Sequence, residues 1–322
     1  MNPRRILLAA WLLALVLPAW AQAPARIAWI VASSAGDDDA NLAAFRDGMR
    51  EQGLQDGRHY VIEVRYADGK YERFPAITAE LIKRQPALFI VRTIASVRAA
   101  QQATKTIPIV FVSTNDPVGN GLVASLARPG GNTTGLATQA EDIITKQVEF
   151  MHEALPRASR AAVLINPGNA SGPQLFGRVQ AAAAGIGITT RAFEAATPES
   201  LDGVFAAIAQ YRPEALLSIG DAMLSDQRDR IISFALKQRM PHFGSGPQHG
   251  ASGSLISYGT PVPALFRRSA IYVKKILAGV KPADLPVEQP TTFHMVVNLK
   301  TAKTLGITMP LSIMLRATEV IE

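Results

Sequence analysis

The sequence predicts an α/β protein of two Rossmann-like lobes, each built on a parallel sheet. Short apolar runs of strand length alternate with amphipathic helical patterns, as is typical of a doubly wound parallel sheet. The alternation begins again near residue 133, so a second sheet is expected. The chain has 322 residues, 48% of them hydrophobic and 18% charged. That length suits two domains of about 100–150 residues each.

The first lobe is expected to begin with four strands joined by three helices. Leu42, Phe45 and Met49 recur at three- and four-residue spacing, which predicts an amphipathic helix that ends at Gly53. The run "YVIEVRY" alternates as a half-buried strand does, whereas "ALFIV" is apolar throughout and predicts a buried strand. The expected strands are 26–34, 60–66, 87–91 and 107–112, and the expected helices are 40–52, 74–81 and 94–104.

The second half follows the same order of elements without a recognisable sequence repeat. An extended segment at 133–137 leads into a helical pattern, and apolar runs then alternate with helices as far as residue 258. The expected strands are 161–165, 187–193, 214–219, 240–244 and 253–258, and the expected helices are 141–154, 173–184, 198–209 and 223–238.

The tail departs from this alternation. Helical spacing of Leu265, Ser269, Tyr272 and Ile276 predicts one more helix, which Gly279 ends. Three prolines between positions 282 and 290 then predict a stiff, extended connection, followed by a strand in "HMVVNL" and a helix over 300–305. A proline-rich connection this late in a two-lobed chain is expected to cross from one lobe to the other.

The first 21 residues have the pattern of a secretory signal peptide. Arg4 and Arg5 precede an apolar run, and Ala19-Trp20-Ala21 places small residues at the two positions that define a cleavage site. The alternative is a membrane anchor, but the uninterrupted apolar run, 6–17, is short for a span of about 20 residues. We therefore expect cleavage of residues 1–21 and a mature protein that begins at Gln22.

The chain contains no cysteine, which excludes disulfide bonds and lipid attachment at an N-terminal cysteine. Together with a cleaved signal peptide, this predicts a free periplasmic protein of a Gram-negative bacterium, not a lipoprotein. The formal net charge is +7, or +5 once the two arginines of the signal peptide are removed. No basic run is interleaved with aromatic residues, so nucleic acid is not an expected partner.

Motifs of catalysis and cofactor binding do not occur in the sequence. The five histidines show no metal-ligand spacing, and neither a nucleophile elbow nor a phosphate-binding loop is present. The sequence therefore predicts neither an enzyme nor a metal or other cofactor. Scattered residues that assemble only in space would escape such a search.

Small polar residues follow expected strands in both halves, for example in the run "STND" at 113–116. In parallel sheets, ligands bind beyond the carboxyl ends of the strands, where the first N–H groups of helices have no partner. Two polar rims that face each other therefore predict a cleft between the lobes. Taken alone, Ser34 and Asp116 are better explained as helix caps, so the prediction depends on the convergence of several strand ends.

Two long blocks carry a resemblance to a known family. The segments "IPIVFVSTNDPVGNGLVASLARPGGNTTGL" and "KPADLPVEQPTTFHMVVNLKTAKTLGITMPLSIMLRATEVIE" resemble ABC-transporter substrate-binding proteins of the tryptophan/tyrosine-binding type. The resemblance covers nearly the whole mature chain. It implies a type I periplasmic-binding-protein fold with two lobes joined by three hinge crossings. The expected lobes are residues 26–137 with 259–289, and residues 138–258 with 290–322.

The resemblance and the strand ends together give the expected ligand-binding residues. Arg92 stands where members of the family commonly have a small residue. Pointing inward, it would pair a ligand carboxylate; pointing outward, it would be a surface charge. Tyr258 is expected in the cleft because it adjoins a crossing and clefts use amphipathic aromatic residues. The full expected set is Ser33, Ser34, Arg92, Thr93, Ile94, Ala95, Thr114, Asn115, Asp116, Asn166, Asp221, Ser245 and Tyr258.

The function that this resemblance implies is that of the periplasmic substrate-binding component of an ABC importer. Such a protein would capture a small carboxylate-bearing metabolite, an amino acid or an aromatic acid, by hinge closure. It is expected to act as a monomer and to deliver the ligand to a permease in the inner membrane. The alternative is a periplasmic sensor module that presents its closed form to a receptor, since both functions need the same cleft.

Overall fold

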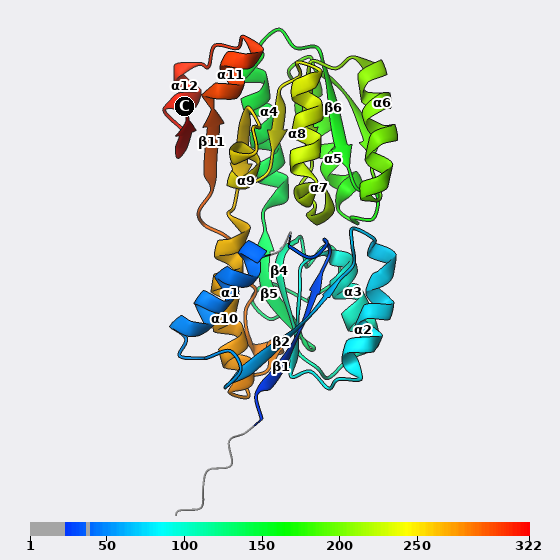
Figure 1. Ribbon diagram of the computed structural model, residues 1–322, viewed down its shortest axis with the longest axis vertical. Coiled ribbons are helices and arrows are strands. Elements are labelled where there is room, and N and C mark those ends of the chain that lie inside the picture. The colour runs from blue at the N-terminus through cyan, green and yellow to red at the C-terminus, as the bar shows by residue number, and fades with distance from the viewer. Residues whose placement is uncertain (1–22, 37–38) are drawn as a thin grey trace, which may run out of the picture.

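The computed structural model describes residues 23–36 and 39–322, and the expected signal peptide lies outside them. Two lobes follow each other along the long axis of the molecule, each with its own sheet (Figure 1). The predicted α/β fold with two mostly parallel sheets is confirmed. Within the described ranges, no helix combines the length and the apolar character that a bilayer span requires.

The first lobe is built on five parallel strands in the order β2-β1-β3-β4-β5. Helices α2 and α3 pack on one face of this sheet, and α1 and α10 pack on the other. The strands are β1 (Ala25–Val31), β2 (Tyr60–Tyr66), β3 (Leu88–Val91), β4 (Ile109–Asn115) and β5 (Thr133–Thr138). The helices are α1 (Asp39–Glu51), η1 (Tyr71–Arg73), α2 (Phe74–Ile82), α3 (Ile94–Ala103), α10 (Val262–Leu277) and η3 (Pro282–Asp284).

The second lobe holds seven strands in the order β12-β11-β10-β9-β8-β6-β7, of which only the β10–β11 pair is antiparallel. The strands are β6 (Arg160–Ile165), β7 (Thr189–Glu194), β8 (Ala215–Ser218), β9 (His242–Gly244), β10 (Ile256–Gly259), β11 (His294–Asn298) and β12 (Glu319–Ile321). The helices are α4 (Ala140–Ala154), α5 (Gly172–Ala184), η2 (Pro198–Ser200), α6 (Leu201–Tyr211), α7 (Ala222–Asp226), α8 (Arg228–Lys237), α9 (Pro247–Ala251), α11 (Leu299–Leu305) and α12 (Leu311–Met314).

The structure differs from the expected elements in a few places of the second lobe. The single helix expected over 223–238 is two helices, α7 and α8, because Gln227 leaves the helical conformation at φ −89° and ψ 10°. Helix α9 was not expected, since its segment is rich in glycine. It begins at Pro247, and proline is tolerated at the first helical position because its missing N–H has no partner there anyway. Helix α12 and strand β12 were also not expected.

Three connections join the lobes. The chain leaves the first sheet after β5 and enters α4, returns between β10 and α10, and leaves again between η3 and β11. Figure 1 shows these segments side by side at the waist of the molecule. The expected lobe boundaries, at 137/138, 258/259 and 289/290, fall at or beside these connections and stay predictions.

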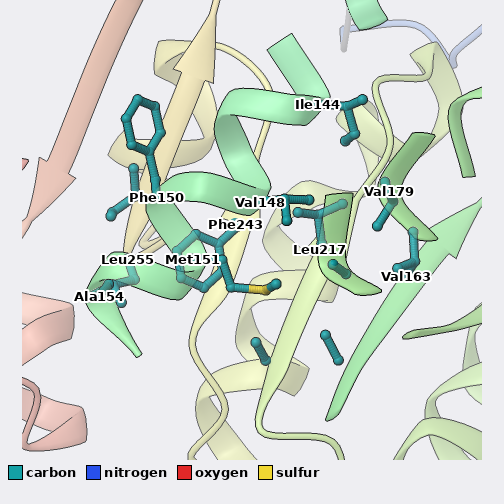
Figure 2. Packing of buried hydrophobic residues seen from close by; sticks show 14 of the residues in the cluster. Ile144, Val148, Phe150, Met151, Ala154, Val163, Val179, Leu217, Phe243 and Leu255 are labelled. Atoms are coloured by element: carbon teal, nitrogen blue, oxygen red, sulfur yellow. The ribbon is translucent and has the colours of Figure 1, made fainter. Parts of the chain in front are cut away.

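Each lobe has its own hydrophobic core. In the second lobe, Phe243 of β9 packs among Val148 and Met151 of α4 and Leu217 of β8 (Figure 2). In the first lobe, the ring of Trp29 stacks on Phe266 of α10 with 4.9 Å between centroids and meets Phe45 of α1 edge-on at 5.0 Å.

Gly48 explains the close packing of α1 against α10. A Cβ atom at this position would lie 2.2 Å from the carbonyl oxygen of Arg267. Any larger residue would therefore push the two helices apart.

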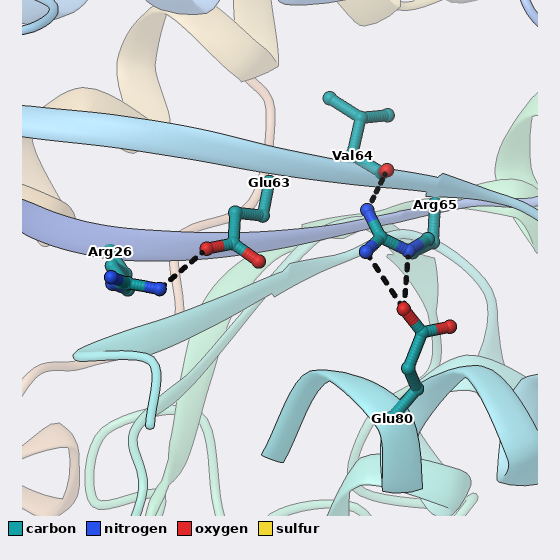
Figure 3. Close-up of polar contacts among 5 residues, drawn as sticks. All are labelled: Arg26, Glu63, Val64, Arg65 and Glu80. Atoms are coloured by element: carbon teal, nitrogen blue, oxygen red, sulfur yellow. Dashed lines mark hydrogen bonds and ion pairs between the residues drawn. The ribbon is translucent and has the colours of Figure 1, made fainter. Parts of the chain in front are cut away.

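Ion pairs cover the exposed edge strand β2. Arg26 of β1 pairs with Glu63 at 3.1 Å, and both Nε and Nη2 of Arg65 donate to Glu80 Oε1 of α2 at 2.9 and 2.8 Å (Figure 3). Exposed pairs of this kind add little stability. Charged side chains along an edge strand do discourage pairing with another chain.

Candidate ligand-binding cleft

A cavity lies between the two lobes, where the strands of the first sheet end. It holds about 930 Å³ of space free of protein atoms, counting the part that is open to solvent. The first lobe lines it with Tyr71, Arg92, Thr93, Ile94, Ala95, Ser113, Thr114 and Asn115. The second lobe contributes Ile143, Ile144, Gly168, Asn169, Leu175, Ile219, Gly220, Asp221, Ser225, Ser245 and Gly246.

The junction between β3 and α3 forms one side of the cavity. Thr93 caps α3, since its Oγ1 accepts from the Ser96 N–H at 3.1 Å while its own N–H donates to Ser96 Oγ at 3.1 Å. Buried Thr114 donates from Oγ1 to the carbonyl oxygen of Arg92 at 2.8 Å and thereby ties the end of β4 to this junction. Ile94 and Ala95, the first residues of α3, line the cavity. The positive end of the helix dipole therefore lies at this side.

Arg92 lines the cavity beside the start of α3. It is partly buried, and no side chain within residues 23–36 and 39–322 makes a hydrogen bond or ion pair with its guanidinium group. Its charge acts on Asp221 and Tyr71, which line the same cavity, so of the two orientations that the sequence left open the structure supports the inward one. A guanidinium group without a partner in a cavity can form a bidentate pair with a carboxylate.

Asp221 lines the opposite side of the cavity and is only 7% exposed. Its Oδ1 accepts from Asn166 Nδ2 and from the Leu224 N–H, both at 3.1 Å, and its Oδ2 accepts from the Tyr71 hydroxyl at 2.9 Å. Burial raises the pKa of the Asp221 carboxyl group, and these three hydrogen bonds and the positive charge of Arg92 oppose the increase.

The remainder of the second-lobe side is mainly apolar, with Ile143, Ile144, Leu175 and Ile219. Ser245 and Gly246 complete it. Buried Gln147 of α4 fixes that segment, because its Nε2 donates to Gly244 O at 2.7 Å, to Ser245 Oγ at 3.2 Å and to Tyr258 O at 3.1 Å. An apolar part of a ligand therefore has more contact surface on this lobe than on the first.

Most of the expected site residues do line this cavity. They are Arg92, Thr93, Ile94, Ala95, Thr114, Asn115, Asp221 and Ser245. Their contact with a ligand stays a prediction.

The other five expected residues lie outside the lining. Ser34 is exposed, and Ser33 lines a small neighbouring cavity. Asp116 accepts from the Gly119 N–H at 2.8 Å within a turn, and Asn166 lies behind Asp221, which it orients. The ring of Tyr258 packs against Phe150 and Phe293, with centroids 5.3 and 5.8 Å away.

The structure also places in the cavity residues outside the expected ligand-binding set. Tyr71 comes from the turn after β2, and its position at the carboxyl end of a strand is a signal that could have identified it. Ser113 has a left-handed φ of +62° and lies in a β-bulge between Val112 and Thr114. No sequence pattern identifies such a bulge at a serine. Thr138, the last residue of β5, and Thr260, in the connection from β10 to α10, also line the cavity.

Two α/β lobes, three connections and a cavity between the lobes define the class of type I periplasmic binding proteins. The family model described as "ABC transporter substrate binding protein" matches residues 26–321. The chain belongs to this family.

Individual proteins of known structure or function are similar to this chain in sequence or in fold. A tyrosine-binding protein of Clostridioides difficile is 22% identical over 267 residues, which are 83% of this chain and 76% of that protein. A conserved domain protein of Vibrio cholerae is 28% identical with a TM-score of 0.85, over 92% of this chain and 99% of that one. An ABC domain of Streptococcus pneumoniae in complex with L-Trp is 23% identical with a TM-score of 0.84, over 92% of this chain and 100% of that one.

Proposed function

We propose that the chain is the substrate-binding component of an ABC importer and that it binds an α-amino acid with an apolar or aromatic side chain. The observation that carries this proposal is the pair of opposite charges in one cavity. Arg92 lies on the first lobe without a partner, and Asp221 lies on the second lobe. A zwitterion between them would satisfy both charges. The tyrosine and L-Trp named for two similar proteins support this ligand class.

Each part of the ligand has a matching part of the cavity. The carboxylate is proposed to bind the guanidinium group of Arg92 and the first N–H groups of α3, those of Ile94 and Ala95. The ammonium group is proposed to bind Asp221. The apolar side chain would then contact the isoleucine and leucine side chains of the second lobe.

Hinge closure is the mechanism that we propose for capture. The ligand would touch both lobes at once, and this is possible only when the lobes are close together. The lobes contact each other directly through Tyr71 and Asp221 and through Asn115 Nδ2 and Ser171 Oγ at 3.2 Å. We further propose a periplasmic, monomeric protein that is freed by cleavage of residues 1–21, carries no lipid, and transfers its ligand to an inner-membrane permease.

Calorimetric titration of the mature protein tests the ligand class. We expect L-tryptophan, L-tyrosine, L-phenylalanine or L-leucine to bind, and 3-phenylpropionate to bind more weakly than L-phenylalanine. A ligand at one hundred times its dissociation constant should stabilise the fold by about 2.7 kcal/mol and reduce the radius of gyration in small-angle scattering. Binding of none of these compounds, or no preference for the amino group, would overturn the proposal.

A further inference from the structure

Tyr71 is the first-lobe residue that contacts the carboxylate of Asp221 across the cleft. It lies in η1, and its hydroxyl donates to Asp221 Oδ2 at 2.9 Å. Its ring is 5.1 Å from that of Phe74, and a Cβ atom on Gly168 of the second lobe would lie 3.2 Å from Tyr71 Cδ2. The ring of Tyr71 therefore packs between the two lobes, and its hydroxyl reaches Asp221 of the second lobe.

The two carboxylate oxygens of Asp221 accept hydrogen bonds from different lobes. Oδ1 receives its hydrogen bonds from Asn166 and Leu224, both in the second lobe. Oδ2 receives its hydrogen bond from Tyr71 of the first lobe. Movement of the lobes apart would leave the bonds to Oδ1 unchanged and break the bond to Oδ2.

The two residues that precede Tyr71 also show that the lobes are in close contact here. A Cβ atom on Gly69 would lie 2.6 Å from Cδ of Pro198 in the second lobe, so the backbone at Gly69 packs against that lobe. Lys70 Nζ lies 3.4 Å from Glu199 Oε1 across the same boundary. The Tyr71–Asp221 hydrogen bond is thus part of a closed contact between the lobes.

We propose that Tyr71 is a positioning residue that orients Asp221 and keeps it ionised on closure, so that the cleft selects ligands with an ammonium group over their deaminated analogues. This inference rests on the proposed function. It adds that selection for the amino group depends on a residue of the opposite lobe and arises only in the closed form.

The electrostatics of the pair agree with this role. Burial, the charge of Asp221 and the shared hydrogen bond raise the pKa of Tyr71 well above its ordinary value, so Tyr71 stays protonated and donates. Burial raises the pKa of Asp221, and the Tyr71 hydrogen bond is one of the interactions that oppose this. Among the described residues, Tyr71 and Arg92 are the titratable or charged groups that act on Asp221. A protonated Asp221 would no longer attract an ammonium group.

Two ligands that differ only in the amino group test the inference, namely L-phenylalanine and 3-phenylpropionate. The dissociation constants of both are measured by calorimetry for the unmodified protein and for Tyr71→Phe, which keeps the ring. We expect the preference for L-phenylalanine to fall about tenfold or more in Tyr71→Phe, the effect of one hydrogen bond to a charged group. We also expect the acidic limit of L-phenylalanine binding to move to higher pH, because loss of the donor raises the pKa of Asp221.

Lys70→Ala is the matched control, since it removes a contact between the lobes that does not involve Asp221. It should weaken both ligands by the same small factor. Asp221→Asn, which keeps the shape of the side chain, should abolish the preference for the amino group.

The possible outcomes separate the inference from the function on which it rests. If Tyr71→Phe weakens both ligands equally and leaves the pH limit unchanged, Tyr71 only holds the lobes together and the inference is wrong. If the unmodified protein shows no preference for L-phenylalanine, the proposed function fails, and the inference fails with it.

Discussion

The two sides of the cleft are built from different chemistry. The first lobe presents strand ends, a capped helix N-terminus and the unpartnered guanidinium group of Arg92. The second lobe presents four large aliphatic side chains and Asp221, whose two oxygens already accept three hydrogen bonds. The first side is therefore mainly polar and offers donors, and the second is mainly apolar with one buried carboxylate.

This difference suggests a division of tasks between the lobes. Backbone N–H groups at a helix end and an arginine recognise a carboxylate, which all amino acids share. An aliphatic surface distinguishes ligands by the size and shape of their side chains. We infer that the first lobe supplies general affinity and that the second lobe supplies most of the selectivity.

The largest expected effect is a loss of folding stability at acidic pH, which arises from two buried histidines of the second lobe. His249 of α9 is 4% exposed, its Nδ1 has no partner, and its ring stacks on that of His242. Burial lowers the pKa of His249 to about 4 and that of His242 well below its ordinary value. The unfolded chain thus binds more protons than the folded protein below pH 6.5. Stability is complete above that pH and should fall by about 3 kcal/mol as the pH decreases from 6.5 to 4 through His249 alone.

Urea unfolding at several pH values, followed by circular dichroism, measures this loss. His249→Gln should show a smaller decrease in the free energy of unfolding between pH 6.5 and 4. Trp29 is the only tryptophan after residues 1–21 and lies in the core of the first lobe, so its fluorescence follows unfolding of the first lobe separately from the second, which holds His249. If His249→Gln and the unmodified protein lose the same stability on acidification, the buried histidine is not the cause.

The second prediction concerns the polar side of the cleft. Arg92→Ala should weaken binding of L-phenylalanine and of 3-phenylpropionate alike, because both carry the carboxylate. The loss of a hydrogen bond to a charged group costs about 1.5–3 kcal/mol, or about 10- to 150-fold in affinity. Arg98→Ala is the control, since Arg98 is an exposed residue of α3 outside the cavity lining. Equal ligand affinities for Arg92→Ala and Arg98→Ala would show that Arg92 does not contact the ligand.

Sequence reasoning found the strand ends that parallel topology brings together. Arg92 follows β3 and Thr114 lies at the end of β4 in the first sheet, and Asp221 comes shortly after β8 in the second. In each sheet the parallel strands present their carboxyl ends at one edge. Ser33 follows β1 but is covered. The turn after β2 folds over that strand end, where the Asp68 N–H donates to Ser33 O at 3.2 Å and the Gly69 N–H donates to Ala32 O at 2.7 Å.

The same turn places Tyr71 in the position that the sequence analysis assigned to Ser33. Tyr258 lies outside the cavity lining for another reason, since the sequence does not fix which face of β10 its ring occupies. The sequence shows that successive side chains of β10 alternate between the two faces of the sheet. Which of them point toward the cleft depends on how the connection from β10 to α10 is placed. Tertiary contacts, not local propensity, determine that Ser33 and Tyr258 lie outside the cavity lining.

The third prediction compares aliphatic residues on the two sides. Ile219→Val removes one methylene group from the second-lobe lining, and Ile94→Val removes one from the first. Loss of a buried methylene contact costs about 0.8 kcal/mol, or about fourfold. We expect Ile219→Val to reduce the preference for L-phenylalanine over L-alanine by about this factor and Ile94→Val to change it less. A larger change in Ile94→Val would contradict the division of tasks.

The smallest expected effect concerns the ion pair between the lobes. Lys70 and Glu199 lie 3.4 Å apart, but their side chains are 42% and 66% exposed. Water screens such pairs, and their measured contributions are commonly about 0.2–1 kcal/mol. Lys70→Ala should therefore weaken ligand binding by at most about fivefold, and the difference from the unmodified protein should vanish near 1 M salt, where the screening length is about 3 Å.

Calorimetric titration of both proteins at about 0.05 M and 1 M salt decides this point. The buried Tyr71–Asp221 bond should be far less sensitive to salt than the exposed pair, because buried interactions are screened much less. The two contacts lie side by side on the same lobe boundary, so they differ in burial and not in place. If Lys70→Ala weakens binding more than Tyr71→Phe, or if its effect persists in high salt, closure depends on the exposed charges. The buried hydrogen bond would then not be the contact that links the two lobes to ligand selection.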